Sequence, residues 1–244
     1  PVLFPLLAEV LRADGQTIAG IYERNDVPVR ELEGLSQQTG LLFGEVPDRV
    51  EMQENGVRFL VDVKNGQKTG FFLDQKENRA AIAPFVRGQR VLDCFTHTGA
   101  FALNAAAAGA EHVTAVDVSA FALELAAENG KRNGLTNLDY KCADVFDLLT
   151  EMAKEKKCDY DYIILDPPAF TKSRATAKNA YHGYKEINRK AMRLLPRGGY
   201  LATCSCSHFM TDEMFRKMLQ EAKVDYTPLF AEDPQGAALA EKFN

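Results

Sequence analysis

From about residue 75 onward, short apolar runs alternate with amphipathic stretches. We expect strands at residues 90–94, 112–117, 138–142, 161–165 and 199–204, and helices at 75–86, 100–108, 120–133, 145–156, 177–195 and 212–222. Strands and helices that alternate through short loops require right-handed crossovers and a parallel sheet. The pattern therefore predicts an α/β fold, with a Rossmann-like and mostly parallel sheet.

The first part of the chain has a different pattern. An amphipathic helix is expected at residues 4–12, a strand at 17–22 and irregular chain at 34–44, with a turn at 65–66. Two alternating strands, 49–53 and 57–63, flank Asn55-Gly56, a strong hairpin signal because both residues tolerate positive φ. Asp74 is a candidate N-cap, with Glu77 three residues later as in a capping box. We predict a small α+β domain with an antiparallel hairpin at 1–74 and an α/β domain at 75–244.

Composition narrows the class of protein. Hydrophobic residues make up 46% of the chain, and no apolar run approaches the ~20 residues that cross a bilayer. No signal peptide is evident, so the cytoplasm is the expected location and no membrane partner is expected. The five cysteines have spacings that match neither a disulfide framework nor a zinc site. We therefore expect reduced thiols and no metal.

Basic residues are concentrated in one segment of an otherwise acidic chain. The formal net charge is −5, yet residues 171–197 carry eight basic residues against one acid, Glu186. This segment is either the solvated face of a surface helix or a surface that contacts phosphates. Lys172, Arg174 and Arg189 are our candidate contacts to a polyanion.

Residues 90–101 predict a strand, a tight turn and a helix whose free backbone amides face the turn. Gly99 stands without the Gly-x-Gly-x-x-Gly spacing that a pyrophosphate requires, which favours S-adenosylmethionine over a dinucleotide. Asp93 would hold the cofactor's ammonium group, Asp117 its ribose and Asp144 its adenine amine. Each acid has an alternative role as a helix N-cap. The predicted cofactor site also includes Phe95, Thr96, Ser119, Val145 and Asp166.

The last two strands of the predicted sheet end in polar residues. Asp166 precedes Pro167-Pro168, which fix the path of the chain and direct the carboxylate toward a flat base. Capping a loop is the alternative role of Asp166. Cys204 ends the fifth predicted strand and Cys206 lies two residues further on, where a thiolate could add to C6 of a cytosine and activate C5. Spacing alone does not choose between these two cysteines, because alternation places both on one side of an extended strand.

Four ordered segments together resemble the RlmI-type class I methyltransferases: residues 72–79, 93–101, 166–170 and 203–207. The resemblance spans residues 24–221. It implies S-adenosylmethionine as cofactor and methylation of a cytosine C5 in large-subunit ribosomal RNA. It further implies that Cys204 is the nucleophile and that Gln75 and Arg79, like Pro167, lie against the cofactor or substrate.

The resemblance also bears on what surrounds the site. Members of this family usually begin with an RNA-binding PUA domain, so we expect this chain to lack that domain. A homodimer is compatible with the sequence.

Two other functions fit the same residues. One is methyl transfer to an exocyclic amine of adenine or guanine, using Asp166 and no thiol. The other is that of an RNA-binding assembly factor without catalysis.

Overall fold

A computed structural model of the chain describes residues 3–155, 158–171, 176–207 and 209–224. The chain divides into two compact units, with the boundary after Lys76. No helix in the described ranges is long and apolar enough to cross a membrane. The N-terminal α+β unit and the C-terminal Rossmann-like unit agree with the predicted fold class.

The N-terminal unit contains two separate antiparallel strand pairs. Its elements are α1 (Leu3–Ala13), β1 (Gly20–Asn25), α2 (Val29–Leu32), β2 (Gln38–Gly44), β3 (Arg49–Glu54) and β4 (Val57–Asp62). β1 pairs with β2, and β3 pairs with β4 through the hairpin that the sequence predicts. Asn55 and Gly56 both have positive φ, 51° and 82°, as that turn requires.

Three local predictions in this unit were wrong. The predicted strand at 17–22 begins at Gly20 and ends at Asn25, and the segment at 34–44, predicted as irregular chain, contains β2. Asp74 does not cap a helix, because a 3-10 turn over Leu73–Gln75 precedes α3 (Lys76–Val86) and no side chain caps that turn. The two strand differences arise because pairing between β1 and β2, rather than local sequence, decides the backbone there.

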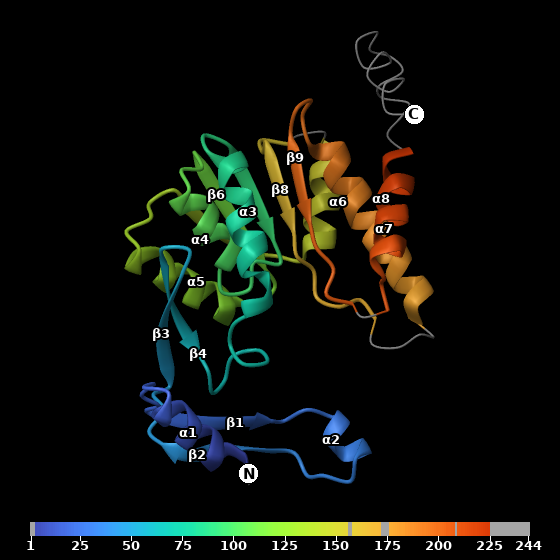
Figure 1. Ribbon diagram of the computed structural model, residues 1–244. Coiled ribbons are helices and arrows are strands. Elements are labelled where there is room, and N and C mark those ends of the chain that lie inside the picture. The colour runs from blue at the N-terminus through green and yellow to red at the C-terminus, as the bar shows by residue number, and fades with distance from the viewer. Residues whose placement is uncertain (1–2, 156–157, 172–175, 208, 225–244) are drawn as a thin grey trace. The chain divides into compact units, whose positions relative to one another are not determined.

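In the described part of the C-terminal unit, five strands form one parallel sheet in the order β7-β6-β5-β8-β9 (Figure 1). The strands are β5 (Arg90–Cys94), β6 (His112–Asp117), β7 (Leu138–Cys142), β8 (Tyr162–Leu165) and β9 (Tyr200–Thr203). The helices that follow α3 are α4 (Ala100–Ala107), α5 (Ala120–Arg132), α6 (Val145–Glu155), α7 (Ala177–Leu194) and α8 (Asp212–Val224). The strand order reverses between β5 and β8, where an open α/β sheet binds its ligand.

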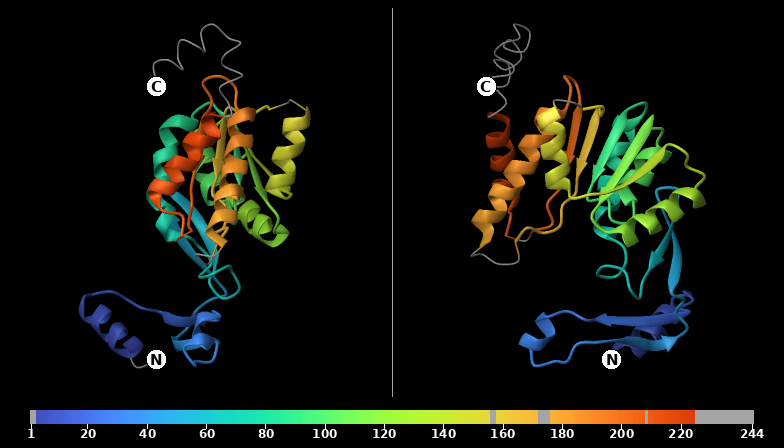
Figure 2. Two further views of the ribbon diagram at one scale, coloured as in Figure 1. Left: turned by 90° about the vertical axis from the view of Figure 1, so that its right-hand side faces the viewer. Right: turned by 180° about the vertical axis from the view of Figure 1, so that it is seen from behind.

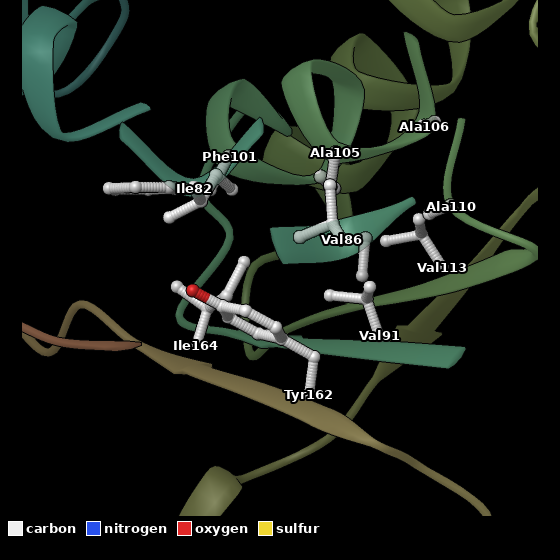
Figure 3. Packing of buried hydrophobic residues seen from close by; sticks show 12 residues of the cluster. Ile82, Val86, Val91, Phe101, Ala105, Ala106, Ala110, Val113, Tyr162 and Ile164 are labelled. Atoms are coloured by element: carbon white, nitrogen blue, oxygen red, sulfur yellow. The ribbon is translucent and has the colours of Figure 1, made fainter. Parts of the chain in front are cut away.

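Each face of this sheet has its own apolar core. On one face, residues of α3 and α4 pack against alternate residues of β5, β6 and β8, including Val91, Val113 and Ile164 (Figure 3). On the other face, α6 and α7 pack against Leu92, Val116 and Ile163. Figure 2 shows α3 and α6 on opposite sides of the sheet. The central strands are buried on both faces, which explains their continuous apolar sequence.

Ile163 tests this two-sided core because its side chain is fully buried in the second cluster. We expect Ile163→Ala to lower the free energy of unfolding by about 3 kcal/mol, because it removes three buried carbon atoms and leaves a cavity. Ile163→Val removes a single methylene and should cost about 1 kcal/mol. Urea denaturation measures both values. Equal stability of the alanine variant and the wild type would contradict the assigned packing.

Candidate functional site

The candidate site lies at the carboxyl ends of the parallel strands, where the strand order reverses. The pairing of β5 with β8 aligns Cys94 with Leu165. The backbone amide of Asp166, just beyond β8, lies 3.4 Å from the carbonyl oxygen of Cys94 and donates to it. The sheet thus brings Asp93 and Asp166, predicted from segments far apart in the sequence, to adjacent strand ends.

The turn between β5 and α4 is wound unusually tightly. Phe95, His97 and Gly99 have positive φ values of 64°, 53° and 83°. The amide of Thr96 donates to the carbonyl oxygen of Val116 at 2.9 Å, which anchors the turn to β6. The amide of His97 donates to Asp117 Oδ2 and the amide of Gly99 donates to the carbonyl oxygen of Thr96, each at 2.9 Å. Hydrogen bonds within the protein therefore fix the shape of this turn beside Asp93.

Asp93 is the most deeply buried acid of the site, with no exposed surface. Its Oδ2 accepts a hydrogen bond of 2.5 Å from the Thr96 hydroxyl, whereas its Oδ1 is buried and has no hydrogen-bond partner among the described residues. Burial raises the pKa of Asp93 to about 7, and the carboxylates of Asp166 and Asp117 add to the rise. A buried, unpartnered carboxylate oxygen fits a cation such as the ammonium group of S-adenosylmethionine.

Asp117 ends β6 and holds two loops together. Its Oδ2 accepts from the amide of His97 and its Oδ1 from the amide of Ser119, each at 2.9 Å. Ser119 in turn caps α5, since its hydroxyl accepts from the amide of Ala122 at 3.2 Å. The backbone of His97 therefore links Asp117, which was predicted to bind the ribose, to the turn that was predicted to bind the cofactor. Sequence reasoning missed this contribution of His97, because a backbone donor has no side-chain signal.

Asp144, the third predicted acid, caps the next helix. Its Oδ1 accepts from the amides of Phe146 and Asp147, at 2.7 and 3.1 Å. The side chain is exposed, and Val145 beside it is buried in the second core cluster. The capping role that the sequence left open is thus observed. Contact between Asp144 and the adenine amine stays a prediction.

The two cysteines after β9 occupy different environments. The amide of Cys204 donates to the carbonyl oxygen of Leu165 at 2.8 Å, so this residue continues the pairing of β9 with β8. Its side chain is partly buried and packs against the first core cluster. Cys206 is exposed, and its Sγ lies 3.8 Å from the carbonyl oxygen of the buried Pro167. Spacing alone did not distinguish the two thiols, but their surroundings in the structure do.

A row of aromatic rings crosses the same edge of the sheet. The ring centroids of Phe95 and Phe146 are 6.5 Å apart, those of Phe146 and Phe170 are 5.7 Å apart, and those of Phe170 and Tyr184 are 4.4 Å apart. All of these residues pack in the core clusters next to the strand ends. No pattern in the sequence marks this row, because its members lie in four separate loops and helices.

The predicted RNA-contacting residues are only partly gathered at the site. Lys172 and Arg174 lie outside the described residues, and Arg189 is partly buried on α7. Arg79 on α3 is almost fully buried, with its guanidinium carbon 5.8 Å from the centroid of the Phe101 ring. Gln75 is also buried, and it belongs to the N-terminal unit. Both side chains are thus buried, and contact of either one with the cofactor or substrate stays a prediction.

Comparison with known proteins identifies a family for this chain. Residues 35–230 match the model of the S-adenosylmethionine-dependent methyltransferases. The chain is 47% identical over 208 residues to ribosomal RNA large subunit methyltransferase I of Aeromonas salmonicida and 48% identical over 208 residues to that of Shewanella denitrificans. These matches cover 84% of this chain and 52% of each relative, so the chain spans about half the length of the relatives it matches.

A solved structure is also similar. The crystal structure of SMU.776 complexed with SAH matches with a TM-score of 0.73 and 26% identity, over 91% of this chain and 57% of that one. The relatives confirm the resemblance to RlmI-type enzymes that the motifs indicated, and together with this structure they confirm S-adenosylmethionine as the cofactor. The buried oxygen of Asp93 that accepts no hydrogen bond from the described residues fits the ammonium group of that cofactor.

Gly99 allows a direct test of the turn. A Cβ at Gly99 would lie 2.5 Å from Leu103 Cδ1 and 2.9 Å from Ala126 Cβ, whereas one at Gly88, which also has positive φ, would have no atom within 4 Å. We expect Gly88→Ala to cost about 1 kcal/mol of stability and Gly99→Ala about 3 kcal/mol. Only Gly99→Ala should weaken S-adenosylmethionine binding, by about tenfold or more, in calorimetric titrations. Equal affinity of the two variants would show that the shape of this turn is not needed for binding.

Proposed function

This chain belongs to the S-adenosylmethionine-dependent methyltransferase family, and from that premise we propose that it methylates C5 of a cytosine in large-subunit ribosomal RNA. Cys204 acts as the nucleophile and Asp166 orients the base. The proposal is supported by the placement of these residues at the ends of the paired strands β8 and β9, next to the strand that carries Asp93.

The chemistry explains why a thiol is needed. C5 of cytosine is a poor nucleophile until a group adds at C6. The Cys204 thiolate would form a bond to C6, which breaks the C5–C6 π bond and leaves an enamine whose nucleophilic carbon is C5. C5 would then take the methyl group of the sulfonium cofactor, whose S–CH3 bond breaks with its electrons on sulfur, so that the thioether S-adenosylhomocysteine leaves. A base removes the proton from C5, the C6–S bond breaks, and the double bond re-forms. Asp166, in the turn next to Cys204, would hold the base edge and, in its acid form, donate a hydrogen bond to N3 as negative charge develops there.

Cys204 is a better candidate than Cys206 for reasons of placement. Its backbone is fixed by the hydrogen bond to Leu165, which holds the thiol in register with the residue before Asp166. Cys206 lies two residues further along, with an exposed side chain against Pro167. A nucleophile that must meet C6 within bonding distance benefits from the more rigid backbone.

The choice of RNA rests on the relatives and on the basic segment. The relatives carry the name ribosomal RNA large subunit methyltransferase, and residues 171–197 have an excess of basic residues. On α7, Lys185 pairs with Glu221 at 3.2 Å and Lys190 pairs with Glu186 at 2.7 Å. Lys178, near the start of α7, is exposed. We therefore assign RNA contact to the N-terminal part of α7 rather than to the whole helix.

Replacing Cys204 tests the covalent mechanism. We expect Cys204→Ala to lower methyl transfer to large-subunit RNA at least about 10³-fold, because C5 stays unactivated, while affinity for S-adenosylmethionine is unchanged. Cys206→Ala is the matched control and should keep substantial activity. Transfer of a labelled methyl group, with calorimetry for the cofactor, measures both.

Nucleoside analysis of the same reaction separates the rival functions. A methyl group on C5 of cytosine supports the proposal. A methyl group on an exocyclic nitrogen, formed equally well by Cys204→Ala, would establish the amine methyltransferase instead. RNA from a strain that lacks this gene serves as the substrate. If the protein binds the cofactor but transfers no methyl group to that RNA, the result would favour the assembly factor.

The salt dependence of binding tests the RNA surface. Lys178→Ala should weaken binding of a large-subunit RNA fragment and reduce the slope of log K against log salt concentration by about one, because one phosphate contact is lost. Lys190→Ala is the control, since the ammonium group of Lys190 already lies 2.7 Å from Glu186 and 2.8 Å from the Thr150 hydroxyl. Fluorescence anisotropy at several salt concentrations gives both slopes. Identical slopes for the wild type and Lys178→Ala would show that Lys178 does not contact RNA and that the RNA-binding surface lies elsewhere.

A further inference from the structure

The two carboxylate oxygens of Asp93 have different surroundings. Oδ2 receives the Thr96 hydroxyl at 2.5 Å, and the Thr96 backbone is itself fixed by a hydrogen bond of 2.9 Å to Val116. Oδ1 is buried and has no hydrogen-bond partner in the described part of the chain. A fully buried carboxylate with one bare oxygen is costly when ionised, and the cost of burial is smaller for the neutral acid.

The groups around Asp93 make the ionised form still less favourable. Asp117 at the end of β6 and Asp166 after β8 both place negative charge near it. Cys94 next to it carries a thiol whose pKa burial raises strongly, so it stays neutral. Burial also lowers the pKa of His97, so this imidazole supplies no compensating positive charge near pH 7. Only the Thr96 hydroxyl and the backbone amide of Ala102 oppose the rise in the pKa of Asp93 among its main determinants.

We propose that Thr96 is a positioning residue that turns one bare oxygen of Asp93 toward the cofactor's ammonium group, and that cofactor binding displaces one proton from Asp93 into solvent. In the cofactor-free protein the proton resides on Oδ1, because Oδ2 already accepts from Thr96. The arriving ammonium group takes the place of that proton and stabilises the carboxylate. The inference depends on binding of the cofactor's amino acid end, not on which atom of RNA is methylated.

The pKa of about 7 sets the pH range of this linkage. An acid whose pKa is raised above its unfolded value of 3.8 binds its proton more tightly in the folded state. Its contribution to the stability of the cofactor-free protein therefore falls as pH rises from about 4 to about 7. Cofactor affinity follows the opposite trend over the same range, because only the ionised form of Asp93 pairs with the ammonium group.

Proton release can be measured without any methyl transfer. Calorimetric titrations with S-adenosylmethionine at pH 6, in two buffers of different ionisation enthalpy, give the number of protons released per cofactor bound. At pH 6 the ligand's amino group is fully protonated, so we expect about 0.9 proton from an acid with a pKa of about 7. S-adenosylhomocysteine, which has the same ammonium group, should release the same number. 5′-Methylthioadenosine, which lacks the amino acid, should release close to none.

Variants assign the proton and test the role of Thr96. Asp93→Asn should bind with no proton release at pH 6, whereas release unchanged in this variant would overturn the assignment to Asp93. Thr96→Val should move the pH of half-maximal release upward, since the ionised carboxylate loses a donor, and Thr96→Ser should restore it. A purely structural role of Thr96 would change the melting temperature of the valine variant but not that pH. Zero release by the wild type at pH 6 would overturn the proposal without any variant.

Discussion

The pairing of β5 with β8 is the contact on which the site depends. These strands are separated by more than sixty residues of chain, yet their register aligns Cys94 with Leu165 and so places Asp93 and Asp166 at adjacent strand ends. The pairing is held by apolar side chains on both faces, including Val91 and Ile164 on one and Leu92 and Ile163 on the other. Because these positions are fully buried, neither strand can slip by one residue without reversing its apolar faces.

That rigid sheet carries one acid that is costly to bury. Burial and the nearby Asp166 and Asp117 raise the pKa of Asp93, and the turn beside it holds Phe95 and His97 at positive φ. Strain and like charge of this kind persist when the surrounding structure fixes them, and they cluster at ligand sites. A cofactor that carries a sulfonium and an ammonium group brings positive charge next to these carboxylates. The site is therefore expected to gain stability on binding rather than to contribute it beforehand.

The sequence predicted the parts of this structure that local patterns determine. The five parallel strands, the Asn55-Gly56 hairpin and the polar ends of β5, β6 and β8 follow from apolar runs and turn residues. β2 was missed because its residues are partly or fully exposed, so no alternation marks it and only pairing with β1 makes it a strand. The burial of Arg79 and the aromatic row from Phe95 to Tyr184 depend on packing between segments distant in sequence. The difference between Cys204 and Cys206 appears only once the end of β9 is fixed.

The central claim, covalent attack by one particular thiol, can be tested by trapping. Large-subunit RNA that contains 5-fluorocytosine permits addition at C6 and methyl transfer, but the fluorine at C5 cannot leave as a proton does. The account predicts a stable protein–RNA adduct that depends on S-adenosylmethionine, with fragmentation of the digested peptide placing the nucleotide on Cys204. An adduct on Cys206, or methylation of unmodified RNA with no adduct from the fluorinated substrate, would contradict it.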